Sequence, residues 1–105
     1  MHPNTDTLAT LDSLLETLLH ILRQEGNTST RYAEHTLEIM RRNIALAQSL
    51  PNGAQQVMPL LKADYRHLFP SKADPFYRWH DSYPQRVRLN REYQQLLEDI
   101  QQLLS

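Results

Sequence analysis

The sequence predicts an all-α protein: a four-helix bundle with a kinked third helix and a short extra helical turn before the last helix. Apolar residues recur at alternating steps of three and four along most of the 105 residues, which places them on one face of a helix. No segment alternates apolar and polar residues as a half-buried strand would. Two glycines and six prolines in the whole chain leave few sites for hairpin turns, so short connections between helices are expected.

The first helix is expected over residues 6–25. Its regular apolar stripe consists of Leu8, Leu11, Leu15, Leu18 and Leu22. Leu14, Leu19 and Ile21 widen this stripe, which is typical of a helix buried on several sides or placed at a subunit interface. We therefore expect either central burial in the bundle or homodimerisation through the first and last helices.

The second helix is expected after a cap-rich turn at residues 27–30 and is expected to end at about Ser49. Its stripe consists of Ala33, Leu37, Met40, Ile44 and Ala47. The third helix follows the stop at residues 51–53 and holds Val57, Leu60, Leu61, Tyr65, Leu68 and Phe69. Pro59 lies inside this segment, and proline lacks the N–H that a helix interior needs. It therefore predicts either a kink or a helix whose first turn begins at Pro59.

Several residues at the helix ends suggest specific caps. Thr5 or Asp6 is expected to cap the first helix, and Gly26 to take the left-handed position just after its end. Asn52 and Gln55 have the spacing of a capping box at the start of the third helix.

The segment from Pro70 to Pro84 holds three prolines and four aromatic residues. Asp74 followed by Pro75 resembles a cap with proline at the first helical position, which predicts a short helical turn over residues 75–82. Pro84 is expected to begin the last helix in the same way. The apolar stripe of that helix consists of Leu89, Tyr93, Leu96, Ile100 and Leu103.

Composition restricts the class of protein. The 11 basic and 12 acidic side chains give a net charge of −1, which excludes a polybasic or acidic interaction tail. The absence of cysteine excludes disulfides, zinc fingers and thiol nucleophiles. Residues 1–105 are expected to form a single helical domain that needs no cofactor or metal. No apolar run is long enough for a membrane span, and the start does not resemble a signal peptide. A cytoplasmic protein with no membrane partner is therefore predicted.

Seven of the eight aromatic residues lie between Tyr65 and Tyr93, in a window with six basic and three acidic side chains. Residues 1–64, with five basic and seven acidic side chains, are net acidic. Tyrosine, tryptophan and arginine dominate binding hot spots, so the window predicts a partner-binding surface. Aromatic residues that plug the end of the bundle are the alternative. The candidate partner-binding residues are Tyr65, Phe69, Phe76, Tyr77, Arg78, Trp79, Asp81, Tyr83 and Arg86.

A small metal-dependent helical enzyme is an alternative function. Its candidate ligands are His35, Glu38, Asp64 and His67. A further pair, Glu16 and His20, has i, i+4 spacing. No Glu-x-x-His motif of the di-metal bundles occurs, however, and pairs of this kind are usually solvated on a helix face. With glycine only at positions 26 and 53, no phosphate-binding loop is possible. We therefore expect the protein not to be an enzyme.

A nucleic-acid-associated regulator is the third function considered. Arg86, Arg88 and Arg91 lie on the first turns of the last helix, with Tyr83 and Tyr93 nearby. Arginines can contact phosphates, and tyrosines can stack on bases. The nearly neutral chain lacks the basic excess of most nucleic-acid-binding domains, so we do not expect nucleic acid as a partner.

One segment carries a family resemblance, through its Leu-Phe-Pro and Trp-x-Asp stretches and the spacing of the residues after them. The residues concerned are Leu68, Phe69, Pro70, Phe76, Tyr77, Trp79, Asp81, Tyr83, Arg86, Leu89, Asn90 and Tyr93. The segment resembles the C-terminal part of small all-helical bacterial immunity proteins of polymorphic or contact-delivered toxin systems. The resemblance implies a cytoplasmic inhibitor that binds one cognate toxin and blocks it, without catalytic residues of its own.

Overall fold

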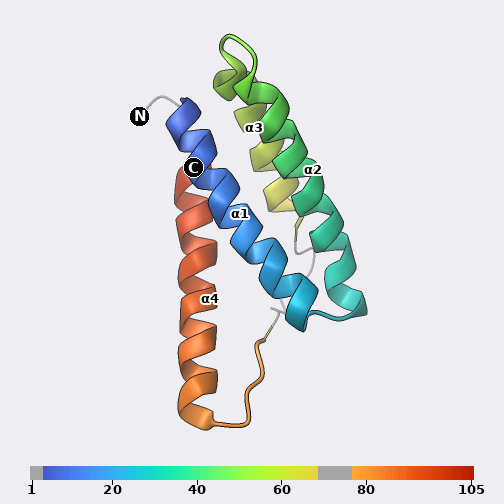
Figure 1. Ribbon diagram of the computed structural model, residues 1–105, viewed down its shortest axis with the longest axis vertical. Coiled ribbons are helices and arrows are strands. Elements are labelled where there is room, and N and C mark those ends of the chain that lie inside the picture. The colour runs from blue at the N-terminus through green and yellow to red at the C-terminus, as the bar shows by residue number, and fades with distance from the viewer. Residues whose placement is uncertain (1–3, 69–76) are drawn as a thin grey trace.

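The computed structural model of the chain describes residues 4–68 and 77–105. It shows four α-helices that run alternately down and up (Figure 1): α1 (Thr5–Glu25), α2 (Arg31–Gln48), α3 (Gly53–Arg66) and α4 (Tyr83–Leu104). A short 3₁₀ helix, Thr28–Thr30, precedes α2. The described residues contain no strand, and the predicted all-α four-helix bundle is confirmed. Within these residues no helix combines the length and apolar content that crossing a bilayer would require.

Helix α1 lies at the centre of the bundle, packed against α2 on one side and α4 on the other (Figure 1). All five leucines of its predicted stripe are buried, and so is Leu19. Leu14 and Ile21 are partly buried against the same core. The wide apolar arc of this helix is therefore covered within one chain, as the prediction of central burial required. Arg41 of α2 donates to Asp12 of α1 at 2.9 Å, which ties the two helices together at the surface.

Helix α3 packs along α2 and makes a smaller contact with α4. It continues through Pro59, so the alternative in which the helix begins at Pro59 is wrong. Both Pro59 and Gln55, whose carbonyl would have bonded the missing N–H, are exposed. Water can therefore hydrate that carbonyl, which reduces the destabilising effect of proline inside a helix. Leu60, the next residue, is also exposed, and Met58 is buried in the core.

The predicted caps differ from those observed. Asn4 caps α1 by accepting a hydrogen bond from the Thr7 backbone N–H at 2.8 Å. The helix therefore begins at Thr5, one residue earlier than predicted, and neither Thr5 nor Asp6 is its cap. Gly26 has extended backbone, with φ −77°, and not the left-handed conformation. Glycine is needed there because a Cβ would overlap the Leu22 carbonyl oxygen and the Thr30 side chain. Asn52 itself takes the left-handed conformation, with φ 58°, and its side chain makes no cap hydrogen bond.

Residues 77–82, which we call the strap, run without helical structure to the start of α4 (Figure 1). The predicted helical turn over 75–82 is wrong for these six residues, and its first part lies outside the described residues. The reason is that side chains satisfy the strap's backbone groups. Asn90 bonds both the N–H and the carbonyl of Arg78 at 2.8 Å, and His80 accepts from the Ser82 N–H at 2.9 Å. Pro84 lies in the first turn of α4, as predicted.

Candidate protein-binding surface

The predicted aromatic window divides into an internal pair and an exposed group. Tyr93 is buried in the core, and Tyr65 packs against the same core. The Tyr65 hydroxyl donates to the Leu97 carbonyl of α4 at 3.2 Å, which joins α3 to α4. Burial raises the pKa of Tyr65 to about 12 and also raises the pKa of Tyr93. These two residues fit the alternative in which aromatic residues plug the bundle, although the Tyr65 side chain is only partly buried.

The exposed group consists of three aromatic residues on or beside the strap. Tyr77, Trp79 and Tyr83 are 59%, 66% and 67% exposed. Such large apolar side chains are usually less exposed than this, and aromatic side chains are enriched at protein interfaces. Phe69 and Phe76, which were also predicted to bind a partner, lie outside the described residues.

The strap is attached to the bundle by Arg78. Its guanidinium donates to both carboxylate oxygens of Glu25 at the end of α1, with distances of 2.6 Å and 2.9 Å. The Arg78 side chain is only 14% exposed. Asn90 of α4 holds the backbone of the same residue, and its amide also donates to the Arg86 carbonyl at 2.8 Å. Arg78 was predicted to contact a partner, but its donors are used inside the chain, where they fix the position of the strap.

Arg86 stacks on the exposed aromatic rings. Its guanidinium carbon lies 4.2 Å from the centre of the Trp79 ring and 5.4 Å from that of Tyr83. These distances are typical of cation–π contacts. No carboxylate of the described residues forms an ion pair with Arg86. A stacked guanidinium keeps its in-plane N–H groups available, and these groups can bind a carboxylate through two parallel hydrogen bonds.

The remaining residue of the predicted set supports the same cluster. Asp81 accepts a hydrogen bond from the Trp79 indole N–H at 3.3 Å. It therefore orients the indole ring and does not form an ion pair with Arg86 within the described structure. Trp79, Tyr83, Arg86 and Asp81 together form one contiguous surface, which we call the aromatic cluster. Sequence reasoning placed all four in the site but missed Glu25 and Asn90, which position it.

The residues proposed for metal binding do not meet. His35 and His67 are exposed on α2 and at the end of α3, and Glu38 forms an ion pair with Arg23 of α1. Within the described residues, no group of three or more histidine, aspartate and glutamate side chains is placed to hold a metal ion.

The residues proposed for nucleic-acid binding are also divided. Tyr93 is buried and offers no ring for stacking on a base. Arg88 lies 3.9 Å from Glu92 in an exposed pair on the same helix.

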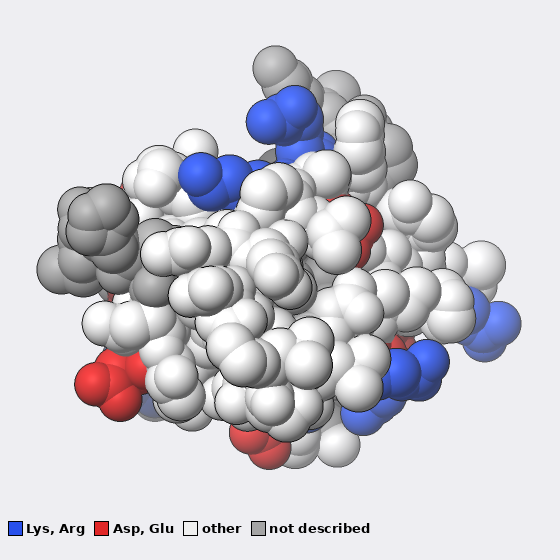
Figure 2. All heavy atoms as spheres, turned by 90° about the horizontal axis from the view of Figure 1, so that it is seen from above, with Lys and Arg blue, Asp and Glu red and all other residues white. Residues whose placement is uncertain are grey.

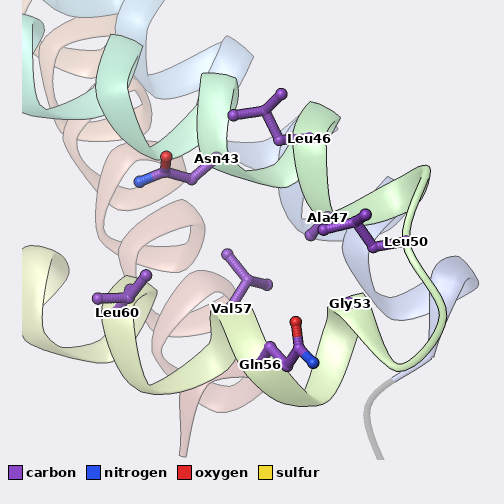
Figure 3. Close-up of a pocket in the computed structure, with 8 residues that line it drawn as sticks. All are labelled: Asn43, Leu46, Ala47, Leu50, Gly53, Gln56, Val57 and Leu60. Atoms are coloured by element: carbon purple, nitrogen blue, oxygen red, sulfur yellow. The ribbon is translucent and has the colours of Figure 1, made fainter.

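A second surface, which sequence reasoning did not identify, lies at the other end of the molecule. It is a groove between α2 and α3 of about 180 Å³ (Figure 3), and its lining residues are Asn43, Leu46, Ala47, Leu50, Gly53, Gln56, Val57 and Leu60. We call it the α2–α3 groove. The signal in the sequence was the absence of charge, because no residue from position 43 to position 61 is charged.

Comparison with known proteins gives no relative for this chain: no protein-family model, curated protein or solved structure matches it.

Proposed function

We propose that this chain is a non-enzymatic protein-binding module that recognises its partner through the aromatic cluster. The observation that carries the proposal is the stack of Arg86 on two aromatic rings that are about two-thirds exposed. Leaving Trp79 and Tyr83 in water forgoes the hydrophobic stabilisation that burying them would give. A partner that covers them recovers this stabilisation on binding, and the rings lose little conformational entropy because Asp81 and Arg86 already hold them.

The partner surface is proposed to carry carboxylates. Among the basic residues of the strap and α4, Arg78 pairs with Glu25 and Arg88 pairs with Glu92. Arg86 and Arg91 form no ion pair with the described residues, so this end of the molecule has an excess of positive charge. An acidic side chain of a partner would meet the free edge of the Arg86 guanidinium while an apolar side chain packs on the Trp79 ring.

The more specific proposal is that the partner is a bacterial toxin and that the chain is its cytoplasmic immunity protein. The support for it is the resemblance of the segment from Leu68 to Tyr93 to small helical immunity proteins, together with the exposure of the Trp-x-Asp stretch within that segment. Inhibition would be steric, because a rigid helical module that occupies the toxin's active site or docking site needs no chemistry of its own.

The test is neutralisation of a toxin encoded beside this gene. The neighbouring reading frame is expressed alone and with this chain, growth is measured, and the affinity of the two purified proteins is determined by calorimetry. Trp79→Ala and Arg86→Glu are expected to weaken binding about 30-fold or more, as hot-spot residues do. The helical circular dichroism should stay unchanged, because both side chains are outside the core.

The matched controls replace an exposed aromatic residue and an exposed arginine that lie on α2, away from the aromatic cluster. Tyr32 on α2 is 58% exposed, and Arg42 on the same helix is exposed and forms no ion pair with the described residues. Tyr32→Ala and Arg42→Glu should leave the affinity within about twofold of the unmodified protein, since most interface-remote surface changes have small effects. Equal losses from the controls and the cluster variants would show that the aromatic cluster is not the binding surface. Binding with no effect on growth would refute the immunity role alone.

A further inference from the structure

The α2–α3 groove combines a hollow with apolar side chains that stand beside it. Leu46, Leu50 and Leu60 are 61%, 54% and 56% exposed. Leu46 and Leu50 are four residues apart, so they form one ridge that runs from the end of α2 into the turn. Leu60 stands on α3 at the opposite wall, and Val57 lies between the walls as part of the floor (Figure 3). The surface thus carries both a protruding ridge and a depression next to it.

The charge distribution distinguishes this end from the rest of the surface. The segment from residue 43 to residue 61 carries no charge, and after Asp99 no charged side chain occurs in α4. Figure 2 looks down on the end of the molecule where the α2–α3 turn lies. Uncharged atoms cover the middle of that end, and lysine, arginine and acidic side chains stand around its rim. A partner held by charge complementarity would find no counter-charge here.

We infer that the α2–α3 groove is the interface of a symmetric dimer of this chain. In a two-fold dimer the same surface is used twice, so it must contain both the ridge and the depression that receives it. The leucine ridge and the groove of about 180 Å³ meet this condition. Two copies can also approach through this surface without bringing like charges together. The strap end suits this less well, because the Arg86 of each copy, unpaired among the described residues, would approach the same excess of positive charge.

The experiment is sedimentation equilibrium of the full chain over a range from micromolar to about 1 mM. The expected result is a concentration-dependent rise from 12.4 kDa toward twice that mass. Leu46→Glu and Leu60→Glu are each expected to raise the dimer dissociation constant at least tenfold, because a charge without a partner would be buried in the contact. Both side chains are exposed, so the variants should keep the thermal midpoint of the monomer.

Ala45→Glu is the matched control. Ala45 is exposed on the same helix, and at about 100° per residue it lies on the side of α2 away from the groove. It should leave the dissociation constant unchanged. Because the chain has no cysteine, Leu50→Cys and Ala45→Cys each introduce one thiol. Mild oxidation should cross-link the Leu50→Cys variant into dimers much faster than the Ala45→Cys variant.

Four results would overturn the inference. The first is a mass that stays at 12.4 kDa up to about 1 mM. The second is a dimer that resists Leu46→Glu but dissociates in Trp79→Ala, which would move the contact to the aromatic cluster. The third is equal cross-linking of the two thiols. The fourth is a monomer that floats with phosphatidylcholine vesicles, which would show that the leucines bind lipid. The first, third and fourth results leave the proposed function standing, whereas the second would show that another copy of the chain competes for the aromatic cluster.

Discussion

The two ends of this bundle are built by different means. At the strap end, polar side chains hold an irregular segment in place: Arg78 pairs with Glu25, and Asn90 bonds the backbone of Arg78. At the α2–α3 end the residues from 43 to 61 carry no charge, and the turn is closed by backbone hydrogen bonds and close contact. Polar anchors allow aromatic rings to remain exposed in a fixed place, whereas the uncharged end leaves a plain apolar groove. We infer that the first arrangement suits selective recognition and the second suits self-association.

The α2–α3 turn should be highly sensitive to a single added methyl group. A Cβ on Gly53 would overlap the carbonyl oxygen of Ala47 and lie 2.7 Å from its carbonyl carbon. We expect Gly53→Ala to lower the free energy of unfolding by about 3 kcal/mol, because backbone atoms must move. Urea unfolding followed by circular dichroism measures the change, with Gln55→Ala on the exposed side of α3 as control. Equal stability of the two variants would show that the backbone of the turn moves to accommodate the Cβ at little cost in free energy.

The strap end should respond most strongly to the loss of Asn90. Its side chain makes three hydrogen bonds, two to Arg78 and one to Arg86. Asn90→Ala is expected to cost about 2 kcal/mol of stability, since partly buried backbone groups lose their partners. Trp79 is the only tryptophan of the chain, so its fluorescence should also shift and become more accessible to quenchers. Unchanged fluorescence would mean that the strap keeps its place without this anchor.

The contact between α3 and α4 should give the bundle a pH dependence of its own. Tyr65→Phe removes the hydrogen bond to the Leu97 carbonyl and should cost about 1 kcal/mol at neutral pH. The folded state holds the phenol proton more tightly than the unfolded chain, in which tyrosine titrates near pH 10. The stabilisation from this difference is therefore complete below pH 10 and is lost as the pH rises toward 12.

Urea titrations at pH 9 and pH 11 measure this loss. The decrease in stability between the two should be smaller in Tyr65→Phe than in the unmodified protein. It should not vanish, because burial also raises the pKa of Tyr93. If Tyr65→Phe loses as much stability between pH 9 and pH 11 as the unmodified protein does, the pH dependence does not come from the raised pKa of Tyr65.

The ion pair between Arg78 and Glu25 should have the smallest effect on global stability. The Glu25 side chain is 31% exposed at the end of α1, so water screens the pair, and ion pairs near the surface contribute little to stability. Glu25→Gln is expected to cost about 0.5 kcal/mol, and the difference should shrink as salt screens the charges. Glu92→Gln, which removes the longer pair with Arg88 at 3.9 Å, should have no measurable effect. If Glu92→Gln lowered the free energy of unfolding more than Glu25→Gln does, the Arg88–Glu92 pair would be the more stabilising of the two, contrary to this prediction.

The sequence predicts the helices well because each one depends on its own periodicity. The stripes of α1 and α2 are buried as their spacing required. The strap was mispredicted because its backbone partners come from Asn90, 12 residues away, where no local pattern could indicate them. The ion pair of Arg78 with Glu25 was missed for the same reason, since the two residues are 53 positions apart. The α2–α3 groove was missed because Leu60 was counted among the apolar residues of the third helix, and only the packing of α2 on α3 shows that it is exposed beside Leu46.

The distance along the chain between Arg78 and Glu25 also bears on the order of folding. Helices α1, α2 and α3 meet through short connections, and contacts of this local kind form quickly. The pairing of α1 with α4 and the attachment of the strap close a much longer loop, whose entropic cost is met only after the local contacts exist. The aromatic cluster is therefore fixed against α1, through the pair of Arg78 with Glu25, only once the first and last helices have come together. A partner that binds it would distinguish finished molecules from chains that are still folding.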